Sequence, residues 1–251
     1  MLAVEALSKS FGGVAAIDDV TLQFAPGSLT AIIGPNGAGK TTFFNLISGA
    51  IPPDRGRVRL FGEEIVGLPP AQIVRRGIAR SFQIASIFPS MTVEAILTAT
   101  VQAHMRQSER IMRRFPLPEC RDRAFAAMDL LGLSDKSALL SSSLSHGDQK
   151  LLDIGMALVL EPRVLLLDEP TAGMGPEERW QMIEKVRELW KRQKVTLVFI
   201  EHDMDVVFKI AESIRVLCYG RVLAEGNPSD IRANPDVIAA YLGTSEETGL
   251  T

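Results

Sequence analysis

A glycine-rich run with a single lysine lies early in the chain and has the composition of a phosphate-binding loop. Residues 34–42 satisfy the pattern G-x-x-x-x-G-K-S/T at every fixed position. Glycines let the backbone approach phosphate oxygens closely, and the amides of such a loop and of the helix after it present partial positive charge. Lys40 adds a full charge, and Thr41 offers an oxygen to Mg²⁺. The run predicts a site for a nucleoside triphosphate and Mg²⁺, with contacts from Gly34, Pro35, Asn36, Gly37, Ala38, Gly39, Lys40, Thr41 and Thr42.

Two acidic residues end an apolar run in the second half of the chain. Asp168 and Glu169 directly follow residues 164–167, which are all Val or Leu. Ligands of open α/β sheets bind beyond the carboxyl ends of the strands, so we expect Asp168 in the Mg²⁺ shell. Glu169 is expected to orient or deprotonate the attacking water. Two acids after a strand also fit a solvated turn, but the phosphate loop upstream favours the catalytic interpretation.

Three further polar positions follow the same order along the chain. Gln83 stands at a predicted strand-to-helix change, where its amide can reach the metal or the water. Ser145 and Gly147 open a predicted helix and can offer a hydroxyl and an amide to a phosphate. His202 follows an apolar run and can donate to a γ-phosphate. Each position also fits an ordinary role, namely a surface glutamine, a helix cap or a solvated histidine.

The elements that must position these residues are strands alternating with helices. Apolar or alternating runs predict strands at 4–11, 20–24, 29–33, 57–61, 64–66, 164–167, 195–200, 214–219 and 221–224. Residues 70–160 have a mostly helical pattern, and periodic apolar positions predict helices at 92–105, 123–131, 176–194 and 204–211. The alternation after residue 160 predicts a mostly parallel sheet. Trp180 and Trp190 fall on the apolar stripe of their helix and are expected in the core.

Together and in this order, the five motifs resemble the ATP-binding cassette family. The resemblance covers residues 2–243 as a single domain and leaves 244–251 as a short tail. It implies an α/β fold: a P-loop ATPase core with a mostly parallel sheet, an N-terminal antiparallel β subdomain and an inserted α-helical subdomain at about 84–160. Its ligands would be ATP and Mg²⁺, and Phe11 stands where the family places an aromatic ring against adenine.

The resemblance also implies roles for individual residues. The implied catalytic residues are Glu169, His202 and Gln83. The implied metal contacts are Thr41, Gln83 and Asp168. The signature, at 144–148, would add nucleotide contacts from Ser145, His146 and Gly147.

Two motifs depart from the family pattern. The usual signature Leu-Ser-Gly-Gly-Gln reads Leu-Ser-His-Gly-Asp here, so His146 and Asp148 are unusual. His146 can donate to a phosphate or simply pack, and Asp148 adds a negative charge. The loop after Glu169 usually reads Ser-Ala-Leu-Asp and here ends at Gly175, so the contact between subunits that this aspartate makes is not carried over.

The resemblance implies partners as well. In this family two cassettes enclose two ATP molecules head to tail, so a second cassette is expected, identical or different. Residues 145–149, 171–176, 200–207 and 234–243 resemble ATPases of branched-chain amino acid importers. That likeness implies two permease subunits, one helix of which enters a groove near Gln83 and 84–88. It also implies an external solute-binding protein and a place on the cytoplasmic side of the inner membrane.

Composition narrows the alternatives. The 251 residues are 46% hydrophobic, and 27 basic against 30 acidic side chains give a net charge of −3, which argues against nucleic acid as the main partner. No apolar stretch approaches the ~20 residues of a membrane span. The N-terminus lacks the features of a signal peptide. Cys120 and Cys218 lie too far apart in sequence to suggest a disulfide framework.

Several other functions stay open. One is a cassette for another cargo, such as urea, amides, aromatic acids or lipid. Another is a cassette in DNA repair or translation, against which the single cassette and the lack of sustained heptads argue. A third is an inactive regulatory subunit, against which Glu169 and His202 argue. The arginines of 106–123 fit a solvated face or, alternatively, contact with a membrane surface or an acidic partner.

Overall fold

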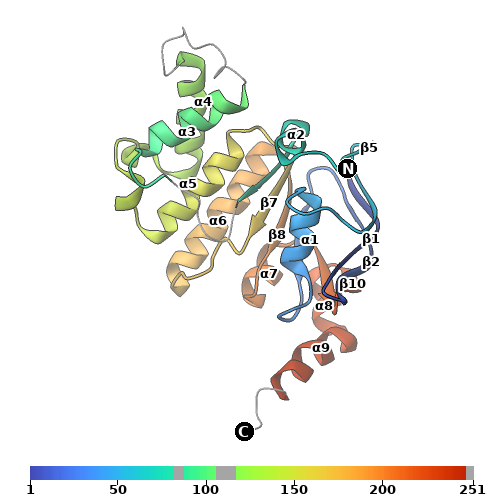
Figure 1. The fold of residues 1–251 in the computed structure, drawn as a ribbon. Coiled ribbons are helices and arrows are strands. Elements are labelled where there is room, and N and C mark those ends of the chain that lie inside the picture. Colours follow the sequence, from blue (N-terminus) through green and yellow to red (C-terminus); the bar gives the residue numbers. More distant parts are fainter. Residues whose placement is uncertain (82–87, 106–116, 247–251) are drawn as a thin grey trace.

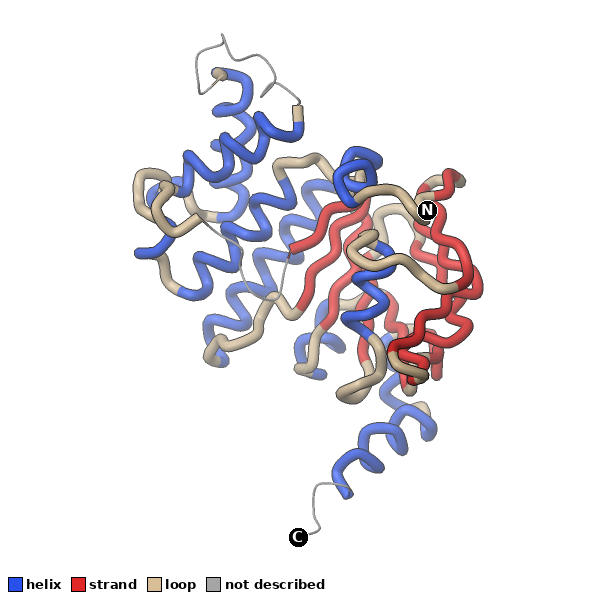
Figure 2. Tube along the Cα trace, viewed as in Figure 1, coloured by secondary structure: helices blue, strands red, loops and turns tan. Residues whose placement is uncertain are grey.

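The computed structural model describes residues 1–81, 88–105 and 117–246, which fold around two sheets flanked by helices (Figure 1, Figure 2). Within these ranges, a four-stranded sheet has the order β2-β1-β4-β5 and a six-stranded sheet the order β10-β9-β3-β8-β7-β6. The first comprises Leu2–Phe11 (β1), Val14–Phe24 (β2), Arg55–Leu60 (β4) and Glu63–Glu64 (β5). The second comprises Leu29–Ile33 (β3), Ile78–Ser81 (β6), Val164–Asp168 (β7), Thr196–Ile200 (β8), Ser213–Cys218 (β9) and Arg221–Gly226 (β10).

The smaller sheet is antiparallel, with β1 paired to both β2 and β4. Strand β2 begins six residues before the predicted start at residue 20. Pairing with β1 continues to the turn at Gly12 and Gly13, whose positive φ angles of 54° and 87° suit glycine. The predicted strand was too short because Val14 is exposed and the first residues of β2 show no apolar alternation.

The larger sheet is mostly parallel, as predicted. Strands β6, β7, β8, β3 and β9 run parallel, and only β10 pairs antiparallel, with β9. Every residue of β3, β7 and β8 is buried, as expected for strands covered on both faces. The strand expected before the change at Gln83 is β6, whose four residues include a charged arginine and interrupt the mostly helical pattern of 70–160.

Nine α-helices are present in the described ranges. They are Lys40–Ile47 (α1), Pro70–Arg76 (α2), Val93–His104 (α3), Pro118–Leu131 (α4), His146–Leu158 (α5), Pro176–Gln193 (α6), Met204–Ile210 (α7), Pro228–Ala233 (α8) and Pro235–Glu246 (α9). Helix α3 starts where predicted, and the Thr92 hydroxyl caps it by accepting from the Ala95 amide at 3.2 Å. Helix α4 starts five residues earlier than predicted because Pro118 suits a first turn. None of these helices combines the length and apolar character of a membrane span.

The core has two layers, one on each face of the larger sheet. Helices α5 and α6 lie on one face, with α3 and α4 packed against them farther from the sheet, and α1 with the antiparallel sheet covers the other face (Figure 1). Side chains alternate between the two layers, so Leu165 and Leu167 face the first and Leu166 faces the second. Trp180 and Trp190 were predicted in the core; they are partly buried and pack against the first layer at its edge. This packing fixes the strand ends from which the candidate site is built.

Candidate nucleotide site

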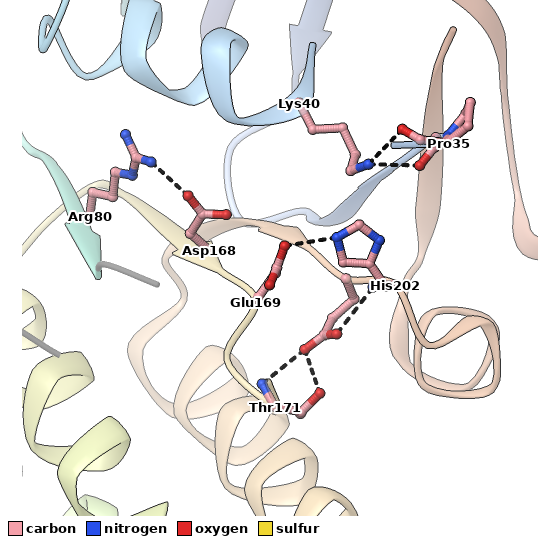
Figure 3. Close-up of polar contacts among 9 residues, drawn as sticks. Pro35, Lys40, Arg80, Asp168, Glu169, Thr171 and His202 are labelled. Carbon is pink, nitrogen blue, oxygen red and sulfur yellow. Dashed lines mark hydrogen bonds and ion pairs between the residues drawn. The ribbon is translucent and has the colours of Figure 1, made fainter. Parts of the chain in front are cut away.

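The predicted site residues lie where parallel strands end side by side. Strand β3 leads into the phosphate loop, β7 ends at Asp168, and β8 leads to His202. Because β8 lies between β3 and β7, residues far apart in sequence meet at one edge of the sheet. Figure 3 shows Lys40, Glu169 and His202 pointing toward a common region. Gln83, just beyond β6, lies outside the described residues.

Two glycines shape the phosphate loop. Gly34 has φ +153°, and a Cβ there would lie 2.1 Å from the Leu217 carbonyl oxygen. Gly39 has φ +99°, and its Cβ would lie 2.3 Å from the Ala16 carbonyl oxygen. No side chain fits at either position, so the loop can hold this conformation only with glycine there. Between them, Pro35 and Ala38 are buried, whereas Asn36 and Gly37 are exposed.

Lys40 begins α1 and folds back over the loop. Its ammonium donates to the Gly34 and Pro35 carbonyl oxygens at 2.7 and 3.0 Å, and the residue is only 6% exposed (Figure 3). Burial lowers the pKa of Lys40, while the charges of Glu169 and Asp168 oppose that change. The next two residues are more accessible: Thr41 is exposed and Thr42 is partly buried.

Asp168 is 2% exposed and has two carboxylate oxygens in different situations. Oδ2 accepts from the Arg80 guanidinium of β6 at 2.6 Å. Oδ1 is buried and has no hydrogen-bond partner in the described part of the chain. A buried carboxylate oxygen without a partner is costly, which marks this position as one where a ligand fits.

Glu169 has a left-handed backbone, with φ +48°, that few non-glycine residues adopt. Its amide donates to the Ile200 carbonyl at 3.0 Å, which ties the end of β7 to β8. Its Oε1 lies 2.7 Å from Nε2 of His202, whose side chain is 46% exposed (Figure 3). The structure therefore brings together the two side chains predicted to act on water and on the γ-phosphate. Backbone strain of this kind gathers at functional sites.

Glu201, which the sequence reasoning missed, organises the surrounding loops. It is 4% exposed, and its Oε1 accepts from the Thr171 amide and hydroxyl at 3.0 and 2.7 Å. Its Oε2 accepts from the His202 amide at 3.2 Å. Burial raises the pKa of Glu201, and the hydrogen bonds from Thr171 and His202 oppose that change. The signal for this role was an acid directly between a buried strand and His202.

The signature residues lie at the start of α5. The Ser145 hydroxyl caps the helix by accepting from the Asp148 amide at 3.1 Å, and it donates to Asp148 Oδ2 at 2.9 Å. The negative charge of Asp148 is paired with Lys136 at 2.7 Å. His146 Nε2 lies 3.1 Å from the Ala172 carbonyl oxygen, so this side chain packs on the loop after Glu169. Figure 1 shows α5 among the helices left of β7 and α1 to its right.

Two further residues predicted to contact the nucleotide, Gly147 and Phe11, have opposite surroundings. Gly147 is buried, and a Cβ there would lie 2.4 Å from Glu178 Oε1. The Phe11 ring, at the far end of β1, is 51% exposed and has the Lys9 ammonium 5.6 Å from its centroid. An exposed aromatic face of this kind is available for stacking.

Comparison with known proteins decides the family. A family model described as "ABC transporter" matches residues 17–172. The high-affinity branched-chain amino acid transport ATP-binding protein LivG of Escherichia coli is 39% identical over 249 residues, 97% of this chain and 98% of LivG. The chain belongs to the ABC transporter family. ATP hydrolysis is the activity of the cassettes of this family.

Further comparisons agree with this family. A second model, described as "Branched-chain amino acid ATP-binding cassette transporter", matches residues 221–247 of the cassette. The ADP conformation of another ABC transporter cassette superimposes with a TM-score of 0.85 at 31% identity, covering 97% of this chain and 98% of that one. A Clostridium perfringens cassette, cbiO1, gives 0.79 at 28% identity and covers 98% of both chains. The fold is therefore that of an ABC cassette over nearly its whole length.

Proposed function

We propose that this cassette is the ATP-hydrolysing subunit of a bacterial importer for branched-chain amino acids or related small polar solutes. The proposal rests above all on Glu169 and His202, hydrogen-bonded to each other at adjoining strand ends in the region that Lys40 faces. The identity with LivG and the match over 221–247 support the cargo class.

Each site residue has a part in the proposed reaction. Lys40, the backbone N–H groups of 36–39 and Thr42 bind the phosphates, and Phe11 stacks on adenine. Glu169 orients the attacking water and accepts its proton, and His202 donates to the γ-phosphate. Since most of this work is positioning and charge stabilisation, a preformed set of groups at one sheet edge suits it.

Mg²⁺ would be held by Thr41, Gln83 and Asp168. When bound, it neutralises charge that develops on the phosphate oxygens. The buried oxygen Oδ1 of Asp168 fits this ion, because Mg²⁺ prefers oxygen ligands. The described residues contain no cluster of three or more acidic, His or Cys side chains that could hold a metal. That is compatible with Mg²⁺, which usually keeps several waters and takes few carboxylates beside substrate phosphates.

A second cassette, identical or different, would complete each site. In the proposed dimer, Ser145, His146 and Gly147 of one subunit face the nucleotide held by the phosphate loop of the other. The test is sedimentation of a Glu169→Gln variant with ATP and Mg²⁺, since this variant binds ATP but cannot activate water. We expect an ATP-dependent dimer, formed by the chain alone or, if the second cassette is a different chain, by a mixture of the two. A chain that stays monomeric with ATP both alone and with the partner cassette contradicts the proposal.

The cassette would bind two permease subunits on the cytoplasmic side of the membrane, with a solute-binding protein outside. The similar cassette cbiO1 is described as part of the ABC transporter complex cbiONQ. An apolar cavity of about 270 Å³ lies between α1, α2, β6, α3 and α5, close to the strand that leads to Gln83. Its lining includes Ala50, Val74 and Met156, and it is suited to an apolar permease helix.

The cargo is tested by transport. The cassette, its partner cassette, the two permeases and the binding protein are reconstituted in vesicles with ATP inside. We expect ATP-dependent uptake of labelled leucine, isoleucine or valine. Uptake of urea or a short amide alone would retain the importer but correct its cargo, and Mg²⁺-dependent ATPase activity with no permease association would contradict the importer.

A further inference from the structure

A buried ion pair joins two neighbouring strands beneath the candidate site. The Arg80 guanidinium of β6 donates to Asp168 Oδ2 of β7 at 2.6 Å (Figure 3). The two side chains are 8% and 2% exposed, so the pair is almost completely removed from water. Such a pair contributes little net stability compared with apolar packing, and a purely structural explanation of it is therefore weak.

Arg80 is held on its other side by α1, the helix that begins at Lys40. Its NH1 nitrogen donates to Asn45 Oδ1 at 2.6 Å, and its guanidinium carbon lies 5.5 Å from the centre of the Phe44 ring. A planar guanidinium can serve all of these contacts at once, whereas a lysine ammonium cannot. Arg80 thus fixes the Asp168 carboxylate relative to the phosphate-loop helix.

This arrangement gives the two carboxylate oxygens of Asp168 different surroundings. Arg80 binds Oδ2, while Oδ1 stays buried without a hydrogen-bond partner in the described residues. Carboxylates that bind metals are usually oriented by hydrogen bonds of this kind from a second group.

We propose that Arg80 is a positioning residue for the magnesium site, holding one oxygen of Asp168 so that the other faces the ion. The inference rests on the proposed function, in which Asp168 serves Mg²⁺. The positive charge of Arg80 acts in the opposite sense, because it repels a cation. Positioning and repulsion therefore predict opposite effects of removing the guanidinium.

The experiment measures binding of a fluorescent ATP analogue rather than turnover. Full-length Glu169→Gln protein is compared with the same protein carrying Arg80→Lys or Arg80→Gln, first in EDTA and then across a Mg²⁺ titration. We expect both variants to need roughly 10- to 100-fold more Mg²⁺ for half-maximal effect, the usual loss when a residue orienting a metal ligand is changed. Affinity in EDTA should not change. The control is Arg123→Gln, because Arg123 pairs with the exposed Glu161.

The other outcomes are equally decisive. A Mg²⁺ requirement that stays equal or falls overturns the inference, and so does an equal loss of affinity with and without Mg²⁺, which indicates a structural role. If the Arg80 variants do not fold, Asn45→Ala is used instead, because it removes one contact of the guanidinium and keeps the ion pair. This variant should raise the Mg²⁺ requirement, and an unchanged requirement overturns the inference. If Mg²⁺ has no effect on the parent protein, the proposed metal assignment of Asp168 fails instead.

Discussion

Glu201 is a single buried carboxylate that accepts three hydrogen bonds from two loops. One loop follows Glu169 and the other carries His202, so Glu201 holds the backbone on both sides of the catalytic pair. Its neighbourhood also contains the charge of Glu169, which adds to the effect of burial in raising the pKa of Glu201.

Glu201→Gln tests this buried charge through the pH dependence of stability. The pKa of Glu201 is raised above its ordinary value of 4.5, so between 4.5 and the raised value the folded state binds more protons than the unfolded state. Stability of the parent protein therefore falls as pH rises through that window. The variant lacks this loss. The difference between its free energy of unfolding and that of the parent should therefore shift in favour of the variant from pH 4.5 upward, and this difference should become constant above the raised pKa.

Denaturant titrations at several pH values measure this difference. A constant penalty of about 1–3 kcal/mol is expected in addition, because the glutamine amide would face the His202 amide, donor against donor. Glu188→Gln is the control, since Glu188 is half-exposed on α6 and pairs with Arg192. Parallel stability curves for Glu201→Gln and the parent would show that Glu201 does not titrate as inferred.

Sequence reasoning predicted the residues of the phosphate loop, the acidic pair and His202 because each follows a recognisable strand. It missed Arg80 and Glu201 for a physical reason. Their partners, Asp168 and Thr171, lie 88 and 30 residues away in sequence. Only the strand order places them in contact, and no local pattern carries that information.

Among the elements, α5 starts at a residue with two possible tasks. Ser145 caps the helix, and in the proposed dimer it also faces the partner's nucleotide. The Asp148 carboxylate strengthens the cap by accepting from the Ser145 hydroxyl. The unusual signature aspartate thus has a local structural role at the helix N-terminus, where a negative charge is favourable.

Ser145→Ala and Ser145→Asn separate the two tasks. Ser145→Ala should lower the free energy of unfolding by about 1 kcal/mol, whereas Asn caps helices as well as Ser and should restore it. In the Glu169→Gln background, both variants should weaken the ATP-dependent dimer, because neither keeps the hydroxyl. Ser143→Ala serves as control, since the Ser143 hydroxyl is exposed and donates to the nearby Leu140 carbonyl. If Ser145→Asn formed the dimer as well as the parent, Ser145 would act only as a helix cap and its hydroxyl would have no role at the nucleotide.

The elements differ in how well sequence predicts them. Strands β3, β7 and β8 are continuous apolar runs, and their bounds were predicted within two residues. Strand β6 was expected before Gln83 but without bounds, because its four residues include Arg80, whose charge is paired with the distant Asp168. The bounds of the helical subdomain at 84–160 remain a prediction; helices α3, α4 and α5 pack together within it.

At the scale of the whole molecule, the apolar cavity beside α1 and α2 lies between the nucleotide-binding core and the helices α3 and α5. A permease helix bound there would contact both the nucleotide-binding core and these helices. A movement of the helices relative to the core would therefore be transmitted to the permease. Arg80 also lines this cavity, which brings the Asp168 contact close to the proposed docking surface.

Ala50→Glu tests docking at this cavity. Ala50 is exposed and lines the cavity, so the substitution should leave folding and the ATP turnover of the isolated cassette intact. A charge buried against an apolar permease helix is expensive, and reconstituted transport should fall by more than about tenfold. Ala126→Glu is the matched control, since Ala126 is an exposed alanine on α4 away from this cavity. Equal transport by both variants would show that the permease does not dock at this cavity.

The strand order has a consequence for synthesis on the ribosome. Strand β3 carries the phosphate loop but pairs only with β8 and β9, which begin at residues 196 and 213. A growing chain therefore makes its nucleotide-binding loop early, on a strand whose two edges stay unpaired until most of the protein has been translated. Such edges favour aggregation, and contacts this distant in sequence form slowly. An interrupted chain that stops short of β8 would carry the loop without the neighbours that hold it, and nascent fragments would not hydrolyse ATP.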